Sequence, residues 1–180
     1  KLILVDNSEA NLYNLEQELS ILNTEKIKIK FILLDVTKEN SVKKLFLREK
    51  INVIFHAAAY KHVPLLEKNP ISGIFNNVFS TYVLANVVRD LSLKKFILIS
   101  SDKAVRPSNV MGASKRFSEL IIQSFAEEMK TGKSVFSMVR FGNVLGSSGS
   151  VVPLFTKQIE NGGPITITHK DMVRYFMTIP

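Results

Sequence analysis

KFILISSDKAVRPSNVMGASKR, residues 95–116, is the stretch that decides the fold. It opens with an apolar run, Lys95–Ser100, that predicts a strand. It closes in a periodic segment that predicts a helix over about Asn109–Met129, ending before Thr131–Gly132. A strand followed by a helix is the unit from which parallel sheets are built, so we expect an α/β protein.

The same alternation extends in both directions along the chain. Strands are predicted over Lys1–Asp6, Ile27–Leu34, Asn52–Phe55 and Val135–Phe141, with a short one over Ile165–Thr168. Helices are predicted over Ser8–Leu19 (with Ser8 or Asn7 as N-cap), Glu39–Leu47, Ile71–Leu91 and Val151–Asn161, and a Gly/Ser-rich loop over Gly142–Ser150. Right-handed βαβ units then give a doubly wound, mostly parallel sheet, whose ligand lies beyond the carboxyl ends of the strands.

Composition excludes several classes of protein. The chain has 180 residues, 46% of them hydrophobic and 22% charged, as in an ordinary globular domain. No cysteine is present, which excludes disulfides and thiolate metal sites, and we expect no metal. No signal peptide opens the chain, and no apolar run reaches the roughly 20 residues of a membrane span. The net charge of +8 comes from scattered lysines, which favours a solvated surface or an anionic substrate over nucleic acid.

Polar or small residues follow the predicted strands. Asp6 stands where dinucleotide-binding folds place the acidic residue that binds the adenosine ribose, although it could equally start a turn. Asp35 and Val36 follow the second strand, within reach of an adenine edge. The run His56–Ala59 (HAAA) would let the backbone approach a ligand closely, or serve as core filler.

The fourth strand is followed by groups suited to proton transfer. Ser100–Lys103 offers two hydroxyls, a carboxylate and an amine at one strand end. Met111 and Lys115 are four residues apart and share one helix face, from which a lysine donates to ribose hydroxyls. The alternative is that Asp102 and Lys103 only cap the next element and that Lys115 is solvated.

Four long runs carry a resemblance to a known family. They are HAAAYKHVPLLEKNP (56–70), ISSDKAVRPSNVMGASKR (99–116), VRFGNVLGSSGSVVPLF (139–155) and VRYFMTIP (173–180). They resemble the polysaccharide-biosynthesis branch of the extended short-chain dehydrogenases, which includes UDP-N-acetylglucosamine 4,6-dehydratases. The resemblance implies a Rossmann fold without its first strand and glycine-rich loop. Residues 1–141 would form a truncated cofactor-binding core, and residues 142–180 the start of the nucleotide-sugar-binding part.

The resemblance also implies a role for each matching residue. Ser101 matches the hydroxyl near C4, Asp102 the acid at the C6 hydroxyl, and Lys103 the base at C5. Positions that contact the NAD cofactor, with NADP as the alternative, match Asp6, Asp35, Val36, Ala57, Ala58, Ala59, Lys61, Asn77 and Lys115. Positions that hold the UDP-sugar match His62, Asn143, Val152 and Arg174.

Met111 departs from the wider superfamily, which has a proton-transferring tyrosine there. Methionine transfers no proton, but the dehydratase subgroup that retains configuration at C5 resembles this chain in having it. The acceptor of the C4 hydroxyl proton is then Asp102, Ser101 or an ordered water. The alternatives are a nucleotide-sugar epimerase or reductase of the same fold, and a cofactor-binding protein without catalysis.

Three further expectations concern the whole protein. Without a glycine-rich loop to hold the pyrophosphate, these 180 residues should bind NAD poorly and turn over little. The resemblance implies a homo-oligomer, for capsule, O-antigen or protein glycan synthesis. It also implies a cytoplasmic location, with upstream helices that anchor the protein to the inner face of the membrane.

Overall fold

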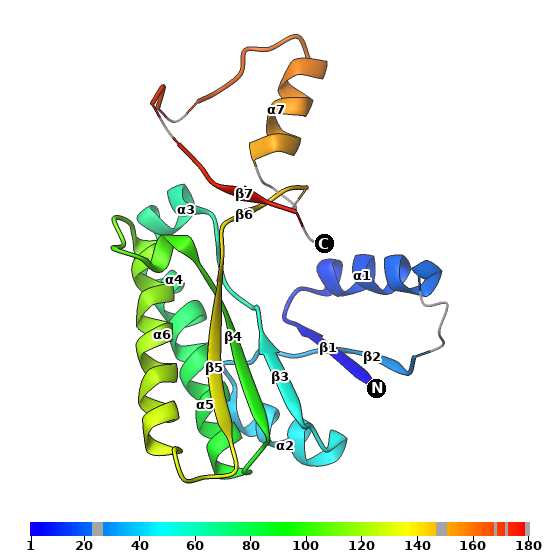
Figure 1. The fold of residues 1–180 in the computed structure, drawn as a ribbon. Coiled ribbons are helices and arrows are strands. Elements are labelled where there is room, and N and C mark those ends of the chain that lie inside the picture. The colour runs from blue at the N-terminus through cyan, green and yellow to red at the C-terminus, as the bar shows by residue number, and fades with distance from the viewer. Residues whose placement is uncertain (23–26, 147–150, 168, 172, 179–180) are drawn as a thin grey trace. The chain divides into compact units, whose positions relative to one another are not determined.

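The computed structural model describes residues 1–22, 27–146, 151–167, 169–171 and 173–178. Helices and strands alternate along the chain (Figure 1). The strands are β1 (Leu2–Asp6), β2 (Ile29–Leu33), β3 (Val53–His56), β4 (Lys95–Ser101), β5 (Val135–Phe141), β6 (Asn143–Val144) and β7 (Phe176–Met177). The helices are α1 (Glu9–Leu22), α2 (Glu39–Glu49), α3 (Val63–Lys68), α4 (Pro70–Ile74), the π-helix η1 (Phe75–Phe79), α5 (Ser80–Asp90), the 3-10 helix η2 (Asp102–Ala104), α6 (Val110–Glu128) and α7 (Val151–Glu160).

The strand pairing is parallel, as the sequence predicts. β1 pairs with β2, with Asp6 opposite Leu33, and β3 pairs with β4, with His56 opposite Leu98. β5 continues the second ladder in the order β3-β4-β5. Within the described residues the ladders β1-β2 and β3-β4-β5 share no strand pairing. A Rossmann sheet has the strand order 3-2-1-4-5-6, so its first strand lies between its second and fourth strands. The break between the two ladders falls at the position that the resemblance implies for this first strand.

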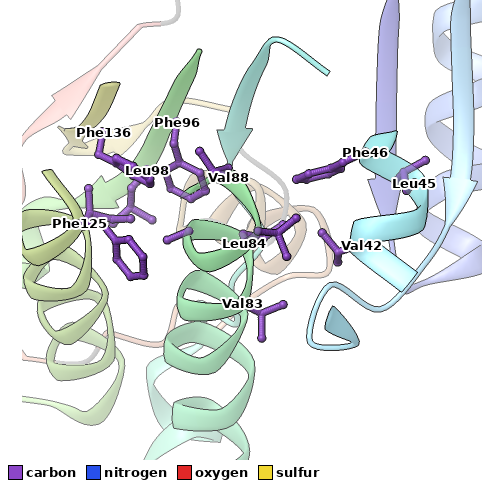
Figure 2. Close-up of a cluster of buried hydrophobic side chains, with 13 residues drawn as sticks. Val42, Leu45, Phe46, Val83, Leu84, Val88, Phe96, Leu98, Phe125 and Phe136 are labelled. Carbon is purple, nitrogen blue, oxygen red and sulfur yellow. The ribbon is translucent and has the colours of Figure 1, made fainter. Parts of the chain in front are cut away.

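The core packs the ladder β3-β4-β5 against helices (Figure 2). Phe96 and Leu98 of β4 are fully buried, and the Phe136 ring of β5 lies 5.5 Å from that of Phe125 in α6. Each such side chain contributes about 1.5–3 kcal/mol by leaving water. The cluster consists of Val42, Leu45, Phe46, Val83, Leu84, Ala85, Val87, Val88, Phe96, Leu98, Ile122, Phe125 and Phe136. This packing fixes β4 along its length and leaves its polar end at the edge.

The predicted helix Ile71–Leu91 is one helical run with a π-helix inside it, since α4, η1 and α5 follow one another without a break. By length and composition the run Pro70–Asp90 is apolar enough to cross a membrane, with mean hydropathy 1.2. In this protein 56% of that window is buried, as in a core helix. The short helices α3 and η2 were not predicted, because neither is long enough to show the hydrophobic periodicity of a helix.

One predicted strand is wrong. Residues 165–167 of the expected strand Ile165–Thr168 form no ladder, and residue 168 lies outside the described part. The backbone N–H of Thr166 donates instead to Oε1 of Gln158 in α7, at 3.1 Å. A side chain therefore takes the place of a neighbouring strand. The chain divides into two compact units, Lys1–Val139 and Arg140–Pro180, and this boundary falls two residues before the predicted one.

Candidate active site

The end of β4 holds a hydrogen-bonded trio. Ser101 Oγ donates to Asp102 Oδ1 at 2.9 Å, and Lys103 Nζ donates to the same oxygen at 3.0 Å. Burial works to raise the pKa of Asp102, but the hydrogen bonds from Lys103 and Ser101 and the charge of Lys103 hold it below its ordinary value. The Asp102 and Lys103 side chains are still 41% and 26% exposed. The trio therefore contains an ion pair, Asp102–Lys103, whose side chains are accessible to a ligand.

The first turn of α6 is packed onto this trio. Asn109 Oδ1 caps the helix by accepting from the Gly112 N–H at 2.8 Å. A Cβ on Gly112 would lie only 2.3 Å from the carbonyl oxygen of Lys103. Only glycine permits this approach of the helix to η2. Met111, beside it, is buried at 5% exposure.

Lys115 is a buried lysine, contrary to the solvated alternative. It is 7% exposed, and its Nζ donates to the carbonyl oxygen of Ile99 in β4 at 2.6 Å. Burial lowers the pKa of Lys115 to about 8, against the charge of Glu119, which raises it. The ammonium is thus fixed one turn of α6 beyond Met111, beside the strand that ends in the trio.

The three alanines follow a buried histidine. His56 is 3% exposed, and its Nε2 lies 3.0 Å from Oγ1 of Thr81 in α5. Burial and the charge of Lys115 lower the pKa of His56 to about 3, so the ring is neutral at physiological pH. Ala57 and Ala58 are exposed and Ala59 is half-buried. The backbone is therefore accessible from the end of β3 onward.

Asn77 holds the loop after these alanines. Its side chain is wholly committed within the protein: Oδ1 accepts from the Tyr60 N–H at 2.7 Å, and Nδ2 donates to the Tyr60 carbonyl at 3.0 Å and to Ser114 Oγ at 2.9 Å. Asn77 is 2% exposed and lies in the π-helix η1. Asn77 therefore connects the loop after β3 to α6. Its role at the site, as the structure shows it, is to hold these two elements together.

A pocket of about 460 Å³ opens beside the loop. Three of the predicted contact residues, Ala59, Lys61 and His62, line it. The rest of its lining comes from Tyr60, Leu65, Leu66, Asn69 and Ser72. The structure thus brings residues predicted for cofactor and for sugar into one cavity.

Asp6 and Asp35 both brace turns at the ends of β1 and β2. Asp6 Oδ1 accepts from the Ser8 N–H at 2.8 Å, in keeping with the turn alternative. Asp35 Oδ1 accepts from the N–H and hydroxyl of Thr37 at 2.9 and 2.7 Å. Burial works to raise the pKa of Asp35, but these bonds hold it below its ordinary value. Val36 packs against the core.

The second unit holds the other predicted sugar contacts. Asn143 donates to the Tyr175 carbonyl through its N–H at 3.0 Å and its Nδ2 at 3.2 Å. This brings Asn143 next to Arg174, which is exposed. Val152 lies in α7 at 43% exposure. β6 and β7 pair in parallel and create this proximity within the unit.

Sequence reasoning missed two residues beneath the site, Glu119 and Ser114. Glu119 is fully buried and accepts from Ser100 Oγ at 2.6 Å, and Ser114 joins the Asn77 network. The available signal was spacing: Glu119 is four residues from Lys115, on the face that also carries Met111 and Ile122. A charged residue on a buried helix face requires a partner inside the protein.

Comparison with known proteins gives a family match over the whole chain. A family model described as "Polysaccharide biosynthesis protein" matches residues 1–180. The chain is 48% identical to the capsular polysaccharide biosynthesis protein CapD of Staphylococcus aureus over 180 residues, all of this chain and 30% of that protein. It is also 38% identical over 152 residues, 84% of this chain and 44% of the relative, to a UDP-glucose 4-epimerase of Rickettsia rickettsii.

Solved structures agree with the fold. The X-ray structure of Pen from Bacillus thuringiensis matches with a TM-score of 0.89 at 34% identity, over 98% of this chain and 54% of that one. DesIV, a dTDP-glucose 4,6-dehydratase of Streptomyces venezuelae solved with NAD bound, matches with a TM-score of 0.80. Its identity of 15%, over 98% of this chain and 67% of that one, shows the fold alone.

Proposed function

The chain belongs to the polysaccharide biosynthesis protein family, and we propose that it carries the proton-transfer residues of a 4,6-dehydratase acting on a UDP-N-acetylhexosamine. UDP-N-acetylglucosamine is the substrate we favour, with retention at C5 and a product for capsule, O-antigen or protein glycan synthesis. The observation that carries the proposal is the trio Ser101, Asp102 and Lys103, with Asp102 Oδ1 accepting at 2.9 and 3.0 Å. An elimination across C5–C6 needs one acid and one base on the same sugar, and this trio supplies both.

The resting pair must lose a proton before it acts. As an ion pair, Asp102 is a carboxylate and Lys103 an ammonium, which is the reverse of what an acid and a base require. Loss of the Lys103 proton to solvent leaves a free amine whose Nζ lies 3.0 Å from Asp102 Oδ1, and the Asp102 carboxylate becomes the acid when it takes the proton that the C4 hydroxyl loses. Lys103 then takes the C5 proton, and Asp102 gives its proton to the C6 hydroxyl, which leaves as water. Lys103 afterwards gives this proton back to C5, so that each turnover ends with the amine and the carboxylate with which it began.

Ser101 completes the proton balance. The proton that Asp102 gives to the departing water equals the one that the C4 hydroxyl loses when C4 is oxidised. Ser101 Oγ already donates to Asp102 Oδ1, so it passes a proton to Asp102 while it accepts one from C4. Met111 needs to supply nothing, because a thioether transfers no proton.

The cofactor we propose is NAD rather than NADP. A nicotinamide would take the hydride from C4 and return it to C6. Exposed Ala57 and Ala58 leave the backbone at the end of β3 open to a large planar ligand, and the fixed ammonium of Lys115 suits ribose hydroxyls. Asp35, Val36, Ala59, Lys61 and Asn77 complete the proposed cofactor set. Asp6 favours NAD, because its carboxylate would repel a 2′-phosphate.

Four residues are the proposed sugar contacts. His62 lines the pocket beside α3, and Asn143, Val152 and Arg174 belong to the second unit. A guanidinium offers paired donors for a pyrophosphate, which is the role we propose for Arg174. Since the chain spans 30% of the length of CapD, the substrate of the whole protein is part of the proposal.

A 4-epimerase is the second candidate, favoured by the Rickettsia relative. Met111 argues against it, because a 4-epimerase of this superfamily normally uses tyrosine there. A reductase of the same fold or a non-catalytic binding protein accounts less well for the ion pair Asp102–Lys103.

The test is proton NMR of UDP-N-acetylglucosamine incubated with the full-length protein and NAD. A new C6 methyl doublet with loss of the hydroxymethyl signals is expected. A changed C4 signal with the hydroxymethyl group retained would make the protein an epimerase. Asp102→Asn should lower the methyl yield about 100-fold or more, whereas Glu127→Gln, at an exposed helix position, should leave it unchanged.

We also propose that the protein is a homo-oligomer whose subunits associate through one apolar face. This face spans α4, η1, α5 and α6 and consists of Ile71, Ile74, Phe75, Phe79, Tyr82, Phe117 and Leu120, each 40–82% exposed. Together they expose on the order of 800 Å², which is what one partner contributes to a standard interface. Asn86, Arg89 and Glu128 form a polar rim at one end. A second copy covers such a face by presenting the same residues.

For the location we propose the cytoplasm, with anchoring helices upstream of this chain. The absence of cysteine from the sequence suits a reducing compartment.

A further inference from the structure

A fully buried carboxylate lies behind the trio. Glu119 of α6 has no exposed side-chain surface. Its Oε1 accepts from Ser100 Oγ at 2.6 Å, and its Oε2 lies 3.0 Å from Nη1 of Arg116. Burying a carboxylate is strongly unfavourable unless it is paired and hydrogen-bonded, so this position needs a compensating interaction. Arg116 supplies only part of one, because its own side chain is 38% exposed to water.

Lys115 and Glu119 bind consecutive residues of the same strand. Lys115 Nζ donates to the carbonyl of Ile99, and Glu119 Oε1 accepts from the hydroxyl of Ser100. The two side chains are also four residues apart on α6, which places them on one face of the helix. Adjacent strand residues are about 3.3 Å apart. The Lys115 ammonium and the Glu119 carboxylate are thus anchored to neighbouring residues of β4 in the interior, directly before the trio.

The titratable groups on the neighbouring elements are either neutral or bound to other partners. His56 of β3 is neutral, and Asp102 and Lys103 of η2 pair with each other. Glu67 of α3 accepts from the backbone of Val110, at the start of α6. On α5, Arg89 pairs with Asp90 and with Glu128 at the far end of α6. The Tyr82 ring lies tilted against that of Phe125.

We propose that Glu119 is a positioning residue that keeps Lys115 protonated and fixed on β4. Burial alone would favour the neutral amine, and the carboxylate beside it opposes that tendency. Ser100 holds the carboxylate in place, so that strand and helix are joined at the point where the trio begins. The use of Lys115 for the cofactor rests on the proposed function, whereas its charge state does not.

The test is a titration of Lys115 by NMR in full-length protein labelled with ¹³C at lysine Cε, with the signal assigned through Lys115→Arg. The wild-type midpoint is expected at about pH 8. Glu119→Gln, which preserves the shape and an acceptor oxygen for Ser100 Oγ, should lower it by roughly one unit or more. Glu119→Asp, which keeps the charge, should restore it to near the wild-type value. Glu127→Gln, at an exposed position of the same helix, is the matched control and should not move it.

A second variant avoids the buried site. Arg116→Gln removes the cation that partly neutralises Glu119, while the amide of the new side chain can still donate to the carboxylate. It should raise the Lys115 midpoint, opposite to Glu119→Gln. An unchanged midpoint in both variants overturns the proposal, even if the protein proves to be a dehydratase. Absence of dehydratase activity in the wild-type protein, together with the expected shifts, would instead count against the proposed function alone.

Discussion

The side chain of Asn77 forms two hydrogen bonds with the backbone of Tyr60: its Oδ1 accepts from the N–H at 2.7 Å, and its Nδ2 donates to the carbonyl at 3.0 Å. Such a paired contact substitutes for a strand neighbour and gives the loop after β3 one conformation. The π-helix η1 places Asn77 where it also reaches Ser114 of α6. Widened helical turns of this kind are frequent at functional sites.

Asn77→Ala should destabilise the protein by roughly 2–4 kcal/mol, because it leaves the polar groups of Tyr60 and Ser114 without their partner. Urea unfolding of the full-length protein measures this free energy. Asn40→Ala, at an exposed position of α2, should change it by no more than about 0.5 kcal/mol. Equal effects of the two substitutions would contradict the role given to Asn77.

Gly112→Ala should impair catalysis more than stability. The new Cβ would lie 2.3 Å from the Lys103 carbonyl, so η2 must move and Lys103 with it. A displacement of about 1 Å costs on the order of 100-fold in rate. Steady-state kinetics with the proposed substrate gives the ratio. Ala113→Gly, next in the helix, should cost stability through helix propensity while sparing the rate.

Met111→Leu should retain activity within about threefold, because the two side chains are similar in volume and neither transfers a proton. Turnover of the proposed substrate checks this. Met111 is buried at 5% exposure, so a packing role is expected. A loss as large as that of Asp102→Asn would mean that the thioether has a direct part in the chemistry.

Glu49 should make stability depend on acid pH. Its side chain, 3% exposed, binds Lys1 at 2.6 Å and Lys30 at 2.8 Å, and these two hydrogen bonds lower its pKa from 4.5 to about 2. A carboxyl group with a depressed folded pKa stabilises fully above about pH 4.5 and loses that contribution as the pH falls toward 2. The urea unfolding midpoint of the wild type should therefore exceed that of Glu49→Gln at pH 7 and pH 5, and the difference should be smaller at pH 3. Glu18→Gln, on the exposed side of α1, is the control and should follow the wild type at every pH.

Phe117→Glu should lower the oligomeric state of the full-length protein. The ring is 57% exposed within the apolar face, and a buried unpaired charge would oppose association. Sedimentation velocity measures the mass of the assembly. Leu47→Glu, at a 64% exposed position of α2 outside that face, should leave the mass unchanged. A wild-type protein that sediments as a monomer at all concentrations would refute the homo-oligomer.

Local signals in the sequence predicted most of the fold. The apolar run at Lys95–Ser100 and the period of residues 109–129 give β4 and α6 to within a residue or two, and Asn109 caps the helix as its type favours. The prediction of a strand at Ile165–Thr168 was wrong because alternation is a local pattern, whereas a strand needs a neighbouring strand to pair with. The Thr166 N–H donates to the side chain of Gln158 instead. The trio after β4 was visible because polar residues at a strand end are adjacent in sequence.

The sequence by itself therefore determined the order of strands and helices, the family, and which side chains with exchangeable protons follow β4. Tertiary structure alone decided which of those groups are buried and what lies beside them. Lys115 would be an ordinary surface lysine by its residue type, but packing of α6 on β4 removes it from water and places Glu119 and Ile99 at its side. The charge state of a group depends on solvation and on partners distant along the chain, and neither is encoded in a local stretch of residues.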